Sequence, residues 1–147
     1  MRCKTGTLLL LCMAWLSPAI AEPLLPPCPD SPNCVSSLAS NERHAIAALQ
    51  AGDSAESART ALIALLDSLP RVTWTGSGEQ RLHAAFTTRL LRFTDDVDFY
   101  LRSDGHIEVR SASRTGYYDF GTNRRRVEAL RNALQNVQRQ TGPADAP

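Results

Sequence analysis

Acidic and arginine side chains concentrate in two segments of this 147-residue sequence, residues 93–99 and 110–126. The first segment carries three aspartates, and the second carries five arginines among serine, tyrosine and asparagine residues. Arginine binds phosphate and carboxylate groups through two parallel hydrogen bonds, and aspartate can act as a general base. This pattern predicts a binding site for an anionic group or a catalytic site.

The predicted anion site includes the start of a helix over residues 123–140, with Asn123 or Thr122 as its N-cap. Three consecutive arginines, residues 124–126, fall in its first turn, where the helix dipole disfavours positive charge. Nearby acidic groups or a bound anion must compensate, and the free backbone N–H groups of a helix start favour an anion. The residues predicted to bind the ligand are Arg110, Ser111, Ser113, Arg114, Asp119, Asn123, Arg124 and Arg126.

Two alternatives remain open for these segments. A small enzyme would use Asp95 or Asp96 as general base, with Tyr117 as proton donor and Arg114 holding the substrate. In a structural or assembly role, the aspartates would instead neutralise the arginines in a closed network of salt bridges. No nucleophile–base pair is recognisable in the sequence, so the anion-binding function is the preferred prediction.

The first 21 residues have the pattern of a cleavable signal peptide. Basic residues at positions 2 and 4 precede an apolar run over 8–16, and residues 19–21 form the small-x-small pattern that signal peptidases cleave. The run is shorter than the roughly 20 residues that span a bilayer, so no transmembrane segment is expected in the mature chain. Cleavage near Ala21 would give a periplasmic or secreted protein.

The mature chain is expected to form a single domain over residues 22–140, followed by a disordered tail at 141–147. Removal of the two leader basic residues leaves 14 arginines against 15 acidic side chains. This near-neutral charge argues against non-specific nucleic-acid binding. Cys28 and Cys34 are the remaining cysteines, and an oxidising compartment favours a disulfide between them. The histidines lack paired ligand spacing, so no metal is expected. No cofactor is expected either.

Two helices and four strands are predicted, with a further short helical stretch over 42–49. The first helix begins near Asp53, which with Glu56 would form a capping box, and it ends before Pro70. The apolar stripe of the last helix consists of Val127, Leu130, Leu134 and Val137. The predicted strands cover residues 71–75, 80–88, 96–102 and 106–111. This order predicts an α+β fold, in which an antiparallel four-stranded meander carries both helices on one face.

The turn between the last two strands sets their register. Directly opposed residues of an antiparallel pair share a face. A two-residue turn would place apolar residues of one strand opposite polar residues of the other, so it is excluded. A three-residue loop, Ser103–Gly105, places Leu101 opposite Ile107 and Asp98 opposite Arg110, with its terminal glycine in the left-handed conformation. The hairpin therefore brings the acidic segment alongside the arginine segment.

Three segments resemble the domain-of-unknown-function 1499 family over roughly residues 28–135. They read SPNCVSS at 31–37, FTDDVDF at 93–99, and RSASRTGYYDFGTNRRR at 110–126. The aromatic residues Tyr117, Tyr118 and Phe120 depart from the smaller aliphatic residues expected there. The resemblance implies no established activity, cofactor or catalytic residue.

Overall fold

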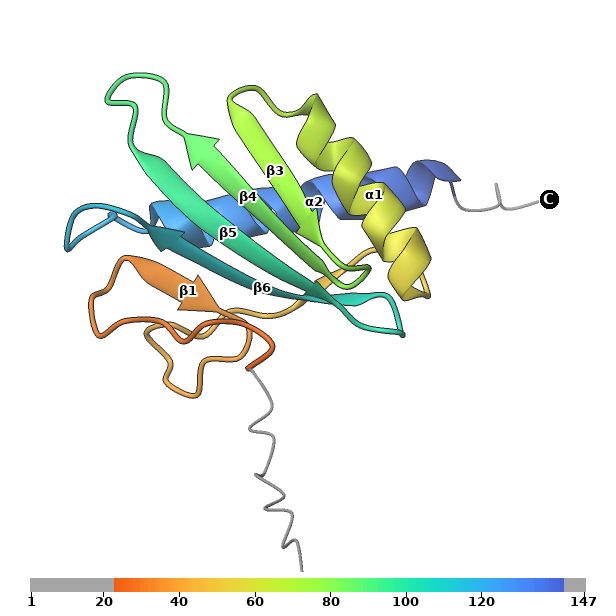
Figure 1. Ribbon diagram of the computed structural model, residues 1–147, viewed down its shortest axis with the longest axis horizontal. Helices are drawn as coiled ribbons and strands as arrows, with labels where there is room; N and C mark the ends of the chain where they lie inside the picture. Colours follow the sequence, from red (N-terminus) through yellow and green to blue (C-terminus); the bar gives the residue numbers. More distant parts are fainter. Residues whose placement is uncertain (1–22, 142–147) are drawn as a thin grey trace, which may run out of the picture.

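Two helices cover one face of a six-stranded antiparallel sheet in the computed structural model, which describes residues 23–141 (Figure 1). The predicted signal peptide lies outside the described residues, and so does the predicted tail apart from Thr141. The elements are β1 (Cys34–Ser36), β2 (Leu49–Gln50), α1 (Ala55–Ser68), β3 (Val72–Ser77), β4 (Arg81–Thr87), β5 (Thr94–Leu101), β6 (His106–Ser113) and α2 (Thr122–Thr141). Strands β3 to β6 form the predicted meander, and the α+β class is confirmed.

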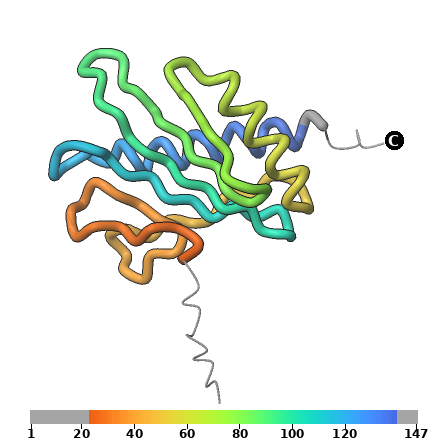
Figure 2. The backbone as a smooth tube through the Cα atoms, viewed as in Figure 1, coloured from red at the N-terminus to blue at the C-terminus, as the bar shows by residue number. Residues whose placement is uncertain are grey.

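The edge of the sheet beyond β6 was not predicted. Strand β1 pairs with β6, and the two-residue β2 pairs with the other end of β6. The helical stretch expected over 42–49 is wrong: this segment loops beside β1 and leads into β2 (Figure 2). The backbone of Ser36 donates to the carbonyl of His44 (2.8 Å) and accepts from the N–H of Ile46 (3.3 Å), so the loop is hydrogen-bonded to the sheet edge.

Helix α1 begins one residue later than the sequence predicts. Ser54 is the N-cap in place of Asp53, and Ser57 completes the capping box in place of Glu56. The Ser54 hydroxyl accepts from the Ser57 N–H (3.2 Å), while the Ser57 hydroxyl accepts from the Ser54 N–H (3.1 Å). These reciprocal bonds satisfy two backbone donors that would otherwise lack partners at the helix start. The helix ends at Ser68, before Pro70 as predicted.

The hydrophobic core lies between the sheet and the two helices. Strand side chains alternate between the faces, and the inward ones on β5 and β6, such as Phe99 and Val109, form one core cluster with Leu62 and Leu66 of α1. Helix α2 contributes Val127, Leu130 and Leu134, whereas Val137, predicted in the same stripe, is exposed. No helix among residues 23–141 combines the length and apolar character needed to cross a membrane.

The predicted register of the β5–β6 hairpin is confirmed. Leu101 lies opposite Ile107, and Asp98 lies opposite Arg110. Gly105 has a φ of +81° and lies so close to loop 51–53 that a Cβ there would be 2.3 Å from the carbonyl oxygen of Gly52. The turn therefore needs a glycine both for its conformation and for its packing.

The segment before β1 is fastened to the rest of the domain. Cys28 and Cys34 form the predicted disulfide. Arg81 donates to the carbonyl oxygens of Leu24 (2.8 Å) and Pro23 (3.3 Å), and the side chain of Leu25 is buried. The part of the N-terminal segment that is described thus belongs to the folded domain.

Candidate functional site

The predicted aspartate–arginine cluster is divided between the two faces of the sheet. Asp95 and Asp96 are consecutive residues of β5, so their side chains point to opposite faces. Asp95 is on the helix face and only 4% exposed, whereas Asp96 and Asp98 lie on the open face with Arg110. The structure therefore forms two networks, here called the open-face ladder and the helix-face network.

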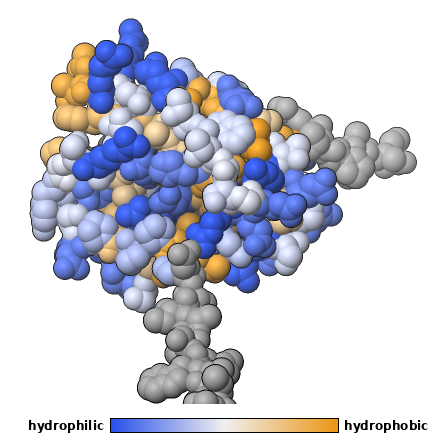
Figure 3. Space-filling model, in the orientation of Figure 1, coloured by the Kyte–Doolittle hydropathy of each residue, from blue (hydrophilic) through white to orange (hydrophobic). Residues whose placement is uncertain are grey.

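The open-face ladder is an alternating row of charged and titratable side chains across β4, β5 and β6. Arg114 binds both oxygens of Asp96 (2.7 and 2.9 Å), and Arg110 binds Asp98 (3.1 Å). His83 lies between the two carboxylates, with Nδ1 2.8 Å from Asp98 and Nε2 3.2 Å from Asp96. Figure 3 shows this face as mostly hydrophilic. Each carboxylate thus already has a cationic partner.

Electrostatics within the ladder favour this closed arrangement. Hydrogen bonding by Arg114 lowers the pKa of Asp96, an effect that outweighs partial burial and is reinforced by the nearby charges of Arg114, His83 and Arg110. The Nε atom of Arg110 is the only buried side-chain nitrogen or oxygen without a hydrogen-bond partner in the part of the chain that the structure describes. The guanidinium of Arg110 therefore makes less than its full set of bonds.

The helix-face network centres on Asn123, whose exposed fraction is 0%. Its amide nitrogen lies within hydrogen-bond distance of the Asn33 carbonyl (2.8 Å), the Ser113 hydroxyl (2.9 Å) and Asp119 (2.8 Å). Its amide oxygen accepts from the Ser111 hydroxyl at 2.7 Å. One buried side chain thus joins helix α2, strand β6 and the segment before β1.

Arg126 extends this network to the acidic strand. One guanidinium nitrogen donates to Asn123 (2.7 Å) and Ser111 (3.0 Å), and the other forms an ion pair with Asp95. The guanidinium lies 5.1 Å from the ring centre of Phe86. Since the Asp95 and Arg126 side chains are largely buried, loss of either partner would leave a costly unpaired charge.

The N-terminal cap of helix α2 comes from Asp119, not from Asn123 or Thr122 as predicted. The Asp119 carboxylate accepts from the backbone N–H groups of Gly121 (2.9 Å) and Asn123 (2.8 Å). Partial burial opposes ionisation of Asp119, but these hydrogen bonds outweigh it and hold its pKa below the ordinary value. A negatively charged carboxylate at this position also interacts favourably with the helix dipole.

The three arginines at the start of α2 reach three different partners. Arg126 pairs with Asp95, Arg125 donates to the Phe120 carbonyl (2.7 Å), and Arg124 donates to the Arg43 carbonyl (3.3 Å). The unfavourable charges are thus offset by one carboxylate and by carbonyl oxygens. Arg124 joins neither network, so the structure does not assemble it with Arg110 and Arg114 into one pocket.

The predicted catalytic side chains are also not brought together. Asp95 and Asp96 point away from each other, and each is bound to an arginine. Tyr117 is 68% exposed and contacts Tyr118 at the tip of the β6–α2 loop, without a hydrogen bond to either aspartate. Within residues 23–141, no group of three or more His, Cys, Asp or Glu side chains is placed to hold a metal ion.

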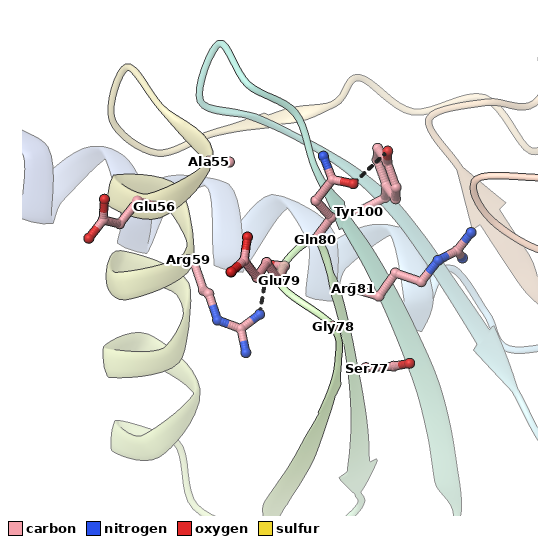
Figure 4. A pocket seen from close by; sticks show the side chains of 9 residues that line it. All are labelled: Ala55, Glu56, Arg59, Ser77, Gly78, Glu79, Gln80, Arg81 and Tyr100. Atoms are coloured by element: carbon pink, nitrogen blue, oxygen red, sulfur yellow. Dashed lines mark hydrogen bonds between the residues drawn. The ribbon is translucent and has the colours of Figure 1, made fainter.

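A depression of about 830 Å³ contains none of the predicted residues. It lies between the start of α1 and the β3–β4 turn (Figure 4). Arg59 donates to the Glu79 carbonyl (3.0 Å), Tyr100 donates to Gln80 (3.2 Å), and Arg81 lies over the Tyr100 ring. Most of its polar side chains are therefore already engaged with one another, and its charge is mixed.

A second depression, of about 520 Å³, has a strongly positive lining at the opposite end of the sheet. It is lined by Arg71, Arg89 and Arg92 together with Thr73, Thr87, Thr88 and Leu90, and we call it the arginine depression. Among the described residues, none forms a hydrogen bond or ion pair with the side chains of these three arginines. The lining contains no carboxylate. The sequence signal for this site is the pair of arginines that flank two leucines between predicted strands, RLLR at 89–92, and the predicted site did not include it.

These features define an α+β domain whose polar residues are largely committed to internal networks. The family described as protein of unknown function (DUF1499) matches residues 24–134, and the chain belongs to this family. No match is found among curated proteins.

Proposed function

We propose that the protein is an exported module that binds a phosphate- or carboxylate-bearing ligand through the arginine depression. The observation that carries this proposal is the set of three arginines, Arg71, Arg89 and Arg92, that face no acidic partner. Guanidinium groups are the preferred protein donors for phosphate and carboxylate oxygens. The hydroxyls of the neighbouring threonines supply further donors.

For the aspartate–arginine networks we propose the structural role. Arg110, Arg114 and Arg126 each already bind an aspartate, so an incoming anion would be repelled by that carboxylate or would have to displace it. Displacement at Arg126 would leave the buried charge of Asp95 unpaired, which costs several kcal/mol. The unpaired arginines carry no such cost, and this difference favours the arginine depression as the binding site.

Export is the second part of the proposal. It is supported by the signal-peptide pattern over residues 1–21 and by the Cys28–Cys34 disulfide, because such bonds persist mainly in oxidising compartments. The test is N-terminal sequencing of the protein recovered from the periplasm or the medium. We expect the mature chain to start at Glu22; recovery of the full-length chain only in the cytoplasm would contradict export.

Ligand binding is tested by thermal shift and calorimetry with inorganic phosphate, sulfate and succinate. A ligand present at about a hundred times its Kd raises the free energy of unfolding by about 2.7 kcal/mol, which is readily measured. We expect saturable binding of at least one of these anions by the wild-type protein.

The variant Arg89→Gln/Arg92→Asn removes two of the three cationic groups, and asparagine tolerates the left-handed conformation found at Arg92, whose φ is 52°. It should lose the binding. The matched control, Arg43→Gln/Arg139→Gln, removes the same charge from exposed positions outside the depression and should bind normally. Equal binding by both variants would contradict the proposed site.

A further inference from the structure

The arginine depression belongs to a larger surface that displays apolar side chains to solvent. We call this surface the loop end and define it as Arg71, the β4–β5 loop (residues 88–93) and the β6–α2 loop (residues 114–121). The two loops lie at the same end of the sheet because Asp95, near the start of β5, pairs with Ser113 at the end of β6. Figures 1 and 2 show both loops projecting from that end.

The loop end carries most of the large exposed apolar side chains among the described residues. Leu90 is 89% exposed and Phe120 is 81% exposed, and the others here are Leu91, Phe93, Tyr117 and Tyr118. Figure 3 shows hydrophobic side chains beside hydrophilic ones at the corner where the β4–β5 loop lies. Exposure of this many large apolar groups on adjacent loops marks an interaction surface.

The backbone at this end is held in an unusual conformation. Arg71, Arg92 and Phe120 have positive φ values (60°, 52° and 52°), and they are the only non-glycine residues with positive φ in the part of the chain described here. All three lie in the loop end. A guanidinium nitrogen of Arg125 holds the Phe120 carbonyl at 2.7 Å while the Phe120 ring projects outward. Strained backbone of this kind tends to persist where it serves a function.

Charge indicates the kind of partner. The loop end contains four arginines and one acidic residue, Asp119. Arg114 is paired with Asp96 of β5, whereas Arg71, Arg89 and Arg92 have no acidic partner among the described residues. Both oxygens of the Asp119 carboxylate accept backbone N–H groups at the start of α2. The exposed charge is therefore positive, which is complementary to an anionic surface.

We propose that the loop end docks on the surface of a bilayer containing anionic lipids. This inference rests on the proposed function, because the arginine depression would bind the lipid phosphate groups. The leucine and aromatic side chains of the two loops would enter the interfacial layer, where tyrosine and arginine place their apolar parts in lipid and their polar ends in water. Projecting loop tips suit a deformable lipid surface better than the flat or grooved face of a folded partner.

The experiment is co-sedimentation of the mature protein with vesicles of phosphatidylcholine alone or with one quarter phosphatidylglycerol. We expect binding only to the anionic vesicles. Raising the salt concentration from about 0.1 M to about 1 M shortens the Debye length from about 10 Å to about 3 Å and should weaken this binding strongly. Absence of binding to the anionic vesicles, or equal binding to both compositions, would overturn the proposal.

Two variants separate the contributions of charge and apolar insertion. Leu90→Ser/Phe120→Ser and Arg89→Gln/Arg92→Asn should each reduce vesicle partitioning roughly tenfold or more. The control Leu38→Ser changes an exposed leucine outside the loop end and should partition like wild type. Circular dichroism and thermal melts verify that all variants fold. Wild-type partitioning by Leu90→Ser/Phe120→Ser would overturn insertion of the loops.

Failure of this inference can be distinguished from failure of the proposed function. Binding of inorganic phosphate without vesicle binding would reject bilayer docking and leave the anion site standing, whereas loss of both would reject both. Sedimentation velocity without vesicles tests the competing occupant, a second copy of the chain. A wild-type dimer that becomes monomeric in Leu90→Ser/Phe120→Ser would overturn lipid docking in favour of self-association.

Discussion

At the residue scale, the domain depends on polar side chains that serve several segments at once. Asn123 is completely buried and connects helix α2 with β6 and with the backbone of Asn33, which lies 90 residues earlier in the chain. Because a buried polar group without a partner is costly, all members of such a network must be present together. Loss of the Asn123 side chain should therefore lower the stability of the domain.

We predict that Asn123→Ala lowers the free energy of unfolding by about 2–3 kcal/mol, because it leaves the Ser111 hydroxyl and the Asn33 carbonyl each short of a partner. Urea unfolding followed by circular dichroism measures this change. Asn132→Ala, at an exposed position of the same helix, is the control and should change the free energy by less than about 0.5 kcal/mol. Equal effects of the two substitutions would reject the central role of Asn123.

Asp119 leads to a prediction about pH. Its pKa is lowered from the ordinary value of 3.8 in the folded state, so the ionised carboxylate stabilises the fold above that pH, and this contribution is lost as the pH falls below it. Asp119→Asn should cost about 1 kcal/mol near neutral pH, because an amide NH2 group replaces one of the two accepting oxygens and the negative charge at the helix start is lost. The difference from wild type should shrink in acid, as measured by urea unfolding at a series of pH values. A difference that is independent of pH would contradict the assignment.

Some of these residue contacts could be predicted from the sequence and others could not. Alternation along the strand and the parity of the turn were enough to pair Asp98 with Arg110, because both rules are local. The same alternation separates Asp95 from Asp96, but the predicted strand began at residue 96, whereas β5 begins at Thr94. The role of Asn123 depends on a partner far away in the chain, and no local pattern specifies such a contact.

At the scale of elements, turns with left-handed residues determine how the strands meet. Gly105 and Gly78 both have positive φ (81° and 65°), but they differ in their surroundings. A Cβ at Gly105 would overlap the backbone of Gly52, whereas a Cβ at Gly78 would have nothing within 4 Å. The two glycines therefore separate the effect of backbone conformation from that of close packing.

We predict that Gly105→Ala destabilises the protein by at least about 1 kcal/mol more than Gly78→Ala, since both share the conformational cost and only the first also forces two segments apart. Thermal or urea unfolding of the two variants checks this difference. Equal destabilisation would contradict this prediction, because it would mean that loop 51–53 can move away from the hairpin at little energetic cost.

The main elements were predictable because their apolar periodicity is strong, whereas the sheet edge was not. Strand β2 has only two residues, and the chain before it bonds to the edge strand β1. Segments this short carry no periodic signal, and tertiary contacts determine their conformation. The arginine depression escaped prediction for a related reason: it combines Arg71 before β3 with the loop after β4, which meet only because the two strands are antiparallel.

At the scale of the whole molecule, the disulfide helps to hold the segment before β1 against the sheet. That segment also depends on the burial of Leu25, on the bonds from Arg81 to the backbone of residues 23 and 24, and on the contacts of Asn33 with β6 and α2. The disulfide closes a short loop, so it should stabilise the fold by only about 2 kcal/mol in the chain-entropy model.

We predict that Cys28→Ala/Cys34→Ala lowers the free energy of unfolding by about 2 kcal/mol and makes it insensitive to reducing agent, whereas the wild type loses a similar amount on reduction. Hydrogen exchange should show that the loss of stability is local. Amides of residues 23–33 should exchange faster in the variant, while the central strands β4 and β5 keep slow exchange, because the core under them does not include the cysteines. Uniformly faster exchange across the sheet would show that the disulfide supports the entire domain, and the N-terminal segment would then be part of the cooperative core.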